Sequence, residues 1–145
     1  MNTLRANNPF RVYMIIGTAS LLLAVCFGAM GAHALKPILS AEQLQSFETG
    51  IRYQFIHGIV ILFLPTLNNY FSEKHIKQAS LLFILGILFF SFSIYLLNLR
   101  EFLNMPGLKL LGPVTPVGGL LFISGWLLLF IQLIFGSKNI DIEKN

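Results

Sequence analysis

Charged residues divide this chain into long uncharged, mostly apolar runs separated by short polar segments. A helix needs about 20 mostly apolar residues to cross the roughly 30 Å hydrocarbon core of a bilayer. Each uncharged run is long enough to cross once, and the runs cover 12–35, 53–72, 78–99 and 110–137. The pattern therefore predicts four transmembrane helices, with spans at about 12–34, 52–71, 78–98 and 115–136.

Composition agrees with this pattern and limits what else the chain can contain. The 145 residues are 55% hydrophobic and 11% charged, with a mean hydropathy of +0.74, whereas soluble domains carry roughly 25% charged residues. Four spans leave no room for a soluble domain. We therefore expect residues 1–145 to form a single integral membrane domain, an all-α four-helix bundle built from two transmembrane hairpins.

The first run also resembles a signal peptide, because it follows two arginines and ends near the A-x-A sequence at 32–34. It is longer than the 7 to 15 apolar residues of a signal-peptide core. We expect it to be retained as a helix. Its single cysteine, Cys26, excludes an intrachain disulfide, and we interpret it as a small apolar side chain.

Polar residues mark where several helices begin. Asn8 before Pro9 predicts the start of the first helix, and Thr115 is predicted to cap the fourth. Ser40 to Gln43 has the pattern of a capping box. It predicts a short interfacial helix that leads into the second span, with a bend near Gly50.

Small residues recur at helical spacing in the first and last runs. Side chains three and four positions apart share one face of a helix, and small ones let two membrane helices approach closely. We interpret these positions as packing surfaces rather than ligand sites, and we expect Gly28→Leu to disrupt the fold or its assembly. The predicted packing residues are Gly17, Ala24, Gly28, Gly31, Gly118, Gly119 and Gly125.

The polar side chains within the spans are predicted to gather at one membrane face. With four antiparallel spans, the first and third helices end, and the second and fourth begin, on that face. His57 is the most informative member, since an ionisable group inside a span is a functional candidate. The predicted polar cluster consists of His57, Gln54, Tyr53, Ser91, Tyr95, His33 and Thr115.

Two interpretations of His57 stay open at this stage. It binds a ligand or carries a proton, or it is a neutral imidazole that holds neighbouring helices together. Glu48 and Arg52 lie four residues apart on a different face of the same helix, and they are expected to form a solvated ion pair.

Three classes of function fit a protein of this kind. The favoured one is a small accessory or assembly protein that binds a membrane partner. The alternative is a lipid-binding, transport or channel-type protein that acts as an oligomer through the cluster around His57. An enzyme is disfavoured, because the spans carry no i, i+4 metal-ligand pair, G-x-S-x-G, CxxC or paired carboxylates.

We expect no cofactor and no bound metal. The expected partners are membrane lipid and either a membrane protein or further copies of the chain. The net charge of +4 comes from basic residues spread over both ends and all loops, with no basic block between aromatics. Nucleic acid is therefore not an expected partner.

Several segments together resemble a known family of small membrane proteins. They are GAMGAHAL at 28–35, YQFIH at 53–57, FSFSIY at 90–95, LGPVTPVGG at 111–119, and Gly125 with Trp126. With these segments the chain is similar to the YgdD/YwdK-type bacterial proteins, a family defined by a domain of unknown function. The resemblance covers all four spans and implies a four-helix inner-membrane protein, without an established activity. One departure is Phe92, where that family usually has glycine between two serines.

The distribution of basic residues predicts the orientation. The face with both tails and the 71–77 loop carries six lysines and arginines, and the opposite face carries four. By the positive-inside rule, both termini should lie in the cytoplasm of a bacterial cell.

Overall fold

The computed structural model describes residues 8–136, and every regular element in that part of the chain is helical. The helices are α2 (Arg11–Ala32), α3 (Ala41–Phe63), α4 (Glu73–Gly86), α5 (Ser93–Leu99) and α6 (Val114–Phe135). Two 3₁₀ segments, Leu64–Leu67 and Pro106–Leu111, extend α3 and precede α6, and a π-helix at Ile87–Phe92 joins α4 to α5.

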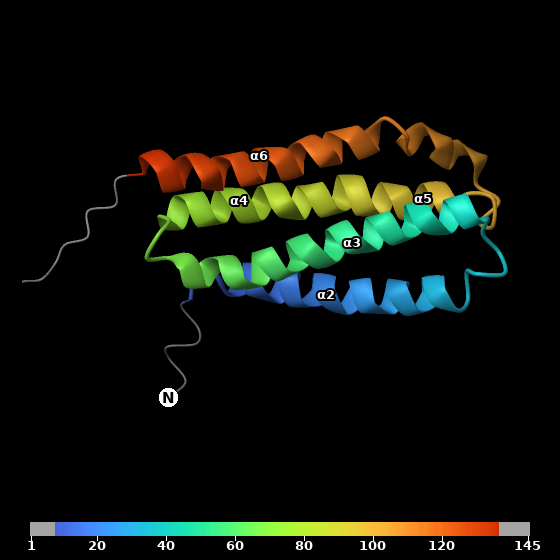
Figure 1. Ribbon diagram of the computed structural model, residues 1–145, viewed down its shortest axis with the longest axis horizontal. Helices are drawn as coiled ribbons and strands as arrows, with labels where there is room; N and C mark the ends of the chain where they lie inside the picture. The colour runs from blue at the N-terminus through green and yellow to red at the C-terminus, as the bar shows by residue number, and fades with distance from the viewer. Residues whose placement is uncertain (1–7, 137–145) are drawn as a thin grey trace, which may run out of the picture.

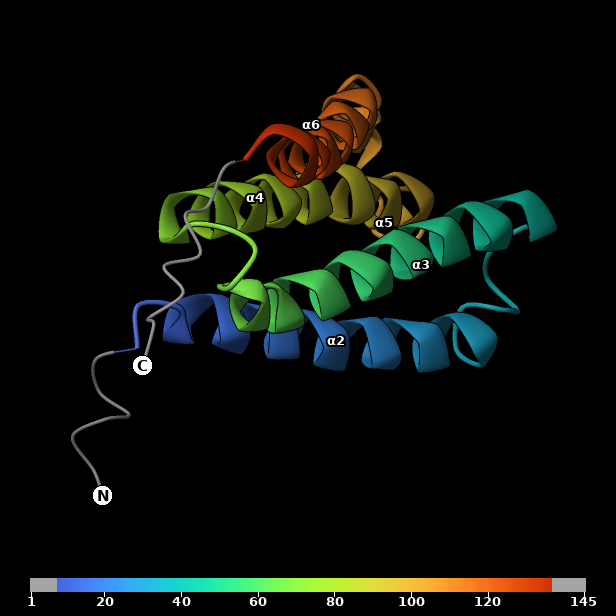
Figure 2. The same cartoon turned by 60° about the vertical axis from the view of Figure 1, so that its left-hand side comes forward.

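These elements form four rods that are long and apolar enough to cross a membrane: Arg11–Ala32, Ala41–Leu67, Glu73–Leu99 and Pro106–Phe135. The rods lie side by side in chain order, with α2 beside α3, α4 beside α6, and α3 beside the α4–α5 rod (Figures 1 and 2). Helices α2 and α6 occupy opposite edges. The structure is thus a four-helix membrane bundle, as the sequence predicts.

The connections are segregated by face. The 33–40 and 100–113 connections lie at one end of the bundle, and the 64–72 connection lies at the other end together with the beginning of α2 and the end of α6 (Figure 1). Each end has its own buried apolar cluster. One contains Leu35, Leu39, Phe47 and Tyr95, and the larger one is built around Ile61, Phe83 and Phe122.

The helix starts differ in part from those predicted. The capping box is confirmed, because the Gln43 N–H donates to Ser40 Oγ (3.2 Å) and the Ser40 N–H donates to Gln43 Oε1 (2.9 Å). Asn8 does not cap α2, which begins at Arg11; its side chain accepts from the Phe10 N–H instead. Thr115 does not cap α6 either, since that helix begins one residue earlier, after Pro113.

No helix break occurs at Gly50, where the sequence predicts a bend. The interfacial turns and the second span form one continuous helix, α3. Gly50 instead makes room for a neighbour, since a Cβ there would lie 2.7 Å from Tyr95 Cε1. It is a packing residue between α3 and α5.

Glycines set the distance between helices at a few points. A Cβ on Gly17 would lie 2.7 Å from the Leu62 backbone nitrogen, so α2 and α3 meet there almost backbone to backbone. On α6, a Cβ on Gly125 would lie 2.5 Å from the Phe83 ring of α4. On α4, a Cβ on Gly86 would lie 2.5 Å from the Phe122 ring of α6. Helices α4 and α6 therefore interlock, each fitting a phenyl ring against a glycine of the other.

Gly28 differs from this expectation. A Cβ at that position would meet nothing within 4 Å, so Gly28→Leu has room in the single chain. Gly31 and Gly119 make only ordinary contacts, since a Cβ on each would lie 3.5 Å and 3.8 Å from the nearest ring atoms, and Ala24 is buried.

Candidate functional site

The first polar contact within the bundle is built around Gln54, which is fully buried on α3. Its Nε2 donates to the Ser20 carbonyl of α2 (2.9 Å), and its Oε1 accepts from the Tyr95 hydroxyl of α5 (2.7 Å). One amide thus satisfies its polar atoms while it ties three helices together.

His57 belongs to a second, separate contact. Its Nδ1 lies 2.8 Å from the Tyr53 carbonyl, and because a carbonyl only accepts, Nδ1 carries the proton. Nε2 is then free to accept the Trp126 indole N–H (3.1 Å). The ring also stacks on Phe122, with 3.6 Å between centroids. His57 is therefore a neutral imidazole with both nitrogens occupied, which joins α3 to α6.

A third contact secures the beginning of α6. Thr115 Oγ1 lies 2.7 Å from Ser93 Oγ, and the Ser93 hydroxyl also reaches the carbonyls of Phe89 (2.6 Å) and Phe90 (2.9 Å). These carbonyls belong to the π-helix, where the regular α-helical pairing is interrupted. Ser93 supplies a donor at this irregular point.

The structure divides the predicted polar cluster. Tyr95 pairs with Gln54 and not with His57. Tyr53 stays with His57, because its carbonyl pairs with Nδ1 and its ring stacks on the imidazole; that ring also packs on Phe90 and Phe122. The buried Ser91 hydroxyl has no hydrogen-bond partner in the described residues. His33 is exposed at the end of α2, apart from the others.

Trp126 is the residue that sequence reasoning missed. The bilayer core holds no water to pair with an indole N–H, so Trp126 needs an acceptor from the protein, and His57 lies at a comparable depth on another helix. The need of the Trp126 N–H for an acceptor is the signal that could have predicted its pairing with His57.

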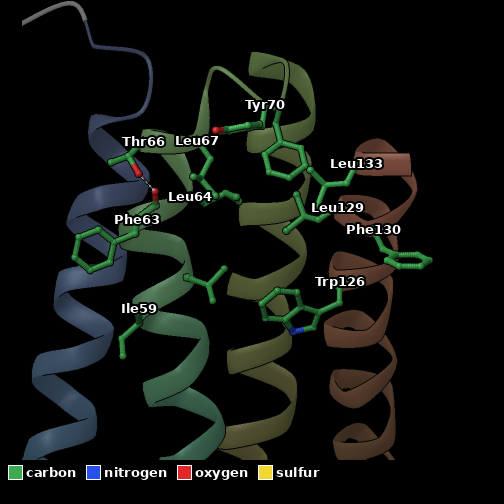
Figure 3. Close-up of a pocket in the computed structure, with 12 residues that line it drawn as sticks. Ile59, Phe63, Leu64, Thr66, Leu67, Tyr70, Trp126, Leu129, Phe130 and Leu133 are labelled. Carbon is green, nitrogen blue, oxygen red and sulfur yellow. Dashed lines mark hydrogen bonds between the residues drawn. The ribbon is translucent and has the colours of Figure 1, made fainter. Parts of the chain in front are cut away.

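Trp126 also lines an apolar groove between α3 and α6 (Figure 3). Its volume is about 530 Å³. Ile59 and Trp126 lie toward the middle of the helices, and Tyr70 and Leu133 lie toward the end that carries the 64–72 connection. We call this the α3–α6 groove. It is lined by Ile59, Val60, Phe63, Leu64, Thr66, Leu67, Tyr70, Phe71, Trp126, Leu129, Phe130 and Leu133.

The groove presents almost no free polar group to an occupant. The Thr66 hydroxyl donates to the Phe63 carbonyl (2.7 Å), and the Trp126 N–H is held by His57. Within residues 8–136, no three His, Cys, Asp or Glu side chains are grouped so that they could hold a metal ion. The groove can recognise an occupant by shape and apolar contact.

Comparison with known proteins identifies the family to which this chain belongs. The profile described as "Protein of unknown function (DUF423)" matches residues 27–119. The chain belongs to the DUF423 family.

Relatives cover nearly the whole DUF423 chain. UPF0382 membrane protein SH2409 of Staphylococcus haemolyticus is 36% identical over 122 residues, which is 84% of this chain and 94% of the relative. UPF0382 membrane protein SSP2132 of Staphylococcus saprophyticus is 37% identical over 121 residues, 83% and 95% of the two chains. UPF0382 membrane protein YwdK of Bacillus subtilis is 31% identical over 125 residues, 86% and 97%. No solved structure matches. The predicted resemblance is confirmed, and the protein is a membrane protein.

The part of this DUF423 chain matched by the profile holds most of the polar contacts. Gln54, His57, Tyr95 and Thr115 lie within residues 27–119. Trp126 lies outside that segment, as does the rest of the α6 side of the groove.

The paired geometry of His57 gives a testable expectation. His57→Gln should fold with a modest loss of stability, because glutamine supplies both a donor and an acceptor. His57→Leu should cost about 1–3 kcal/mol, since it leaves the Trp126 N–H without an acceptor. Thermal unfolding in mild detergent measures both. A full loss of the cellular phenotype in a stably folded His57→Gln protein would instead assign the imidazole a role in ligand or proton binding.

Proposed function

We propose that the protein is a small accessory protein of the bacterial cytoplasmic membrane, which binds a transmembrane helix of a partner protein in the α3–α6 groove. The observation that carries this proposal is the groove itself, about 530 Å³ in volume and lined by large apolar side chains. The relatives of this chain are bacterial proteins that are named as membrane proteins.

The size of the groove supports a helix as the occupant. At 1.5 Å per residue, the eight positions from Trp126 to Leu133 span roughly 10 Å along α6, which is about two turns of contact for a helix packed alongside it. Phe63, Tyr70 and Phe130 stand exposed along the groove. Aromatic side chains are enriched where proteins bind one another, and close packing is what holds membrane helices together.

The polar contacts favour binding over catalysis. Gln54, His57 and Tyr95 are engaged with other groups of the protein, so none is placed to act on a substrate in the groove. We therefore propose a binding role and no enzymatic one.

Site-specific photocrosslinking in cells tests the proposal. A photoreactive residue at Leu133, which is in the groove, should form an adduct with one membrane protein, and the adduct should map to a transmembrane segment of that protein. Ile131 is the matched control, because it lies two residues away on nearly the opposite face of α6 and outside the groove. Ile59→Trp, which fills the groove, should remove the adduct. Equal labelling from both positions would contradict the proposal.

A lipid-binding role is the second candidate, favoured by the almost wholly apolar lining of the groove and its opening between two helices. An acyl chain needs no polar partner, and apart from the exposed Tyr70 hydroxyl the lining of this groove offers none. In the same experiment, adducts with lipid alone at Leu133 would support this candidate over the first. Lipid that co-purifies with the wild-type protein and is lost from Ile59→Trp would do the same.

Orientation in the membrane is a further expectation. If both termini are cytoplasmic, a cysteine at Lys74 should react with an impermeant thiol reagent only after cells are permeabilised. A cysteine at Lys36, on the opposite face, should react in intact cells. Both variants are made with Cys26→Ser, so that a single thiol is present. Labelling of the Lys74→Cys protein in intact cells would reverse the orientation.

A further inference from the structure

Glu48 and Arg52 form an unusual feature on the outer surface of α3. Both side chains are exposed, and neither makes an ion pair or hydrogen bond with any residue in the range 8–136. The solvated ion pair expected between them is therefore not formed. The two ion pairs of the described chain are Lys77–Glu73 and Arg100–Glu101.

The position of this pair makes its lack of a partner significant. A Cβ on Gly31 would lie 3.5 Å from the Phe47 ring, so the last turn of α2 lies beside the α3 turn that carries Glu48. Helix α2 has 22 residues, about 33 Å at 1.5 Å per residue, which is close to the thickness of the hydrocarbon core. Glu48 and Arg52 thus face outward near the edge of that core, where the surroundings are less polar than water and a charge gains more from a partner of opposite sign.

The surface next to these charges is hollow. Glu48 and Arg52 line a depression of about 380 Å³ between α2 and α3, together with Gly28, Ala32, Phe55 and Ile56. Gly28 has open space where a side chain would be. We call these six residues the Glu48–Arg52 face. It combines one negative charge, one positive charge and an apolar hollow, which makes it complementary to a copy of itself.

We propose that a second copy of this chain binds at the Glu48–Arg52 face, so that Glu48 of one protomer pairs with Arg52 of the partner subunit and the reverse pair also forms. Two copies inserted with the same orientation are related by a two-fold axis along the membrane normal, and such an interface uses the same patch on both. The two charges are four residues apart, an axial offset of about 6 Å. Long charged side chains cover a similar offset between the flanking positions of parallel coiled coils.

Gly28 gives the interface room. Because the glycine hollow is not filled by the protein's own side chains, the Phe55 and Ile56 side chains of a neighbouring copy have space against α2. The residues of the Glu48–Arg52 face are distinct from those that line the α3–α6 groove, so the two proposed binding sites can be tested independently.

Charge reversal in two differently tagged copies tests the pairing. The E48R protein carries two positive charges on this face, and the R52E protein carries two negative ones. Each should associate poorly with itself, with co-purification of the two tags reduced about tenfold or more, because like charges face each other. Co-expression of one tagged E48R copy with one tagged R52E copy should restore wild-type co-purification.

The mixed pair separates the proposal from its alternative. If Glu48 and Arg52 act only within one chain, both reversed proteins lose that contact and mixing them restores nothing, which would overturn the proposal. Wild-type co-purification by either reversed protein alone, or no association of wild-type copies, would overturn it as well.

A second variant tests the hollow. Gly28→Leu should abolish co-purification and leave the thermal stability of the single chain unchanged, since the added side chain projects into open space. Leu22→Phe, on another exposed face of α2, is the control and should change neither quantity. Wild-type association of the Gly28→Leu protein would contradict the proposed interface.

Discussion

Gly118→Leu should destabilise the protein by about 3 kcal/mol or more. A Cβ on Gly118 would lie 2.6 Å from the Phe89 carbonyl carbon and 2.8 Å from Phe90 Cα. These are backbone atoms of the π-helix, and they cannot rotate aside as a side chain can. Overpacking of a well-filled interior commonly costs 1–3 kcal/mol, and occasionally more. Thermal unfolding in mild detergent measures the loss.

Gly119→Leu is the matched control for this variant. The two glycines are adjacent on one helix and have the same intrinsic helix propensity, but a Cβ on Gly119 would lie 3.8 Å from the nearest atom of the Phe90 ring. Gly119→Leu should therefore change the free energy of unfolding far less. Similar losses in both proteins would show that helix propensity, and not close approach to the π-helix, explains the effect.

Gln54→Leu should have the second largest effect, because it removes a fully buried amide that joins three helices. The Tyr95 hydroxyl would be left buried without its acceptor, at a cost of about 1–3 kcal/mol. Tyr95→Phe should cost a similar amount by leaving Gln54 Oε1 without its donor. The double variant should lose less than the sum of the two, because neither partner is then stranded.

Tyr70→Phe is the control for the loss of a hydroxyl. The Tyr70 side chain is exposed, and its hydroxyl makes no hydrogen bond within the described residues. This substitution should leave the midpoint of unfolding unchanged. If the effects of Gln54→Leu and Tyr95→Phe are simply additive, the two side chains do not act as a pair.

The architecture was predictable because it depends on properties that a sequence displays directly. Crossing a bilayer requires a long apolar run, and this chain has four. The capping box at Ser40 was predictable for the same reason, since it depends on two residues three positions apart. Both features are local.

Which glycine is needed for packing depends on the neighbouring helix and was therefore not predictable. Spacing placed Gly17 and Gly28 on one stripe of α2, but only Gly17 meets the α3 backbone. Near the other end of α2, Phe27 fills the interface and packs on Phe47 and Tyr95. Because α2 crosses α3 at an angle, the side of α2 that contacts α3 changes along its length. The row of small residues therefore meets α3 at Gly17 but not at Gly28.

The predicted association of His57 with Tyr95 was wrong for a related reason. Counting at 100° per residue shows which side chains share a face of one helix, but not which face of another helix they meet. His57 and Tyr95 were expected together because both are polar and at the same end of the bundle. The structure gives each a different partner, Trp126 and Gln54.

The π-helix at Ile87–Phe92 has a consequence for how chains of this kind can vary in length. A π-turn accommodates one residue more than the α-helix it replaces, so it sets the angle between the segments on either side. Phe83 and Gly86 before it face α6, and Tyr95 and Asn98 after it face α3. Deleting a single residue here would leave the rod nearly the same length but would turn one half by about 100° relative to the other. An alignment gap in this segment would therefore record a change of rotational register, with one of the two helix partners lost.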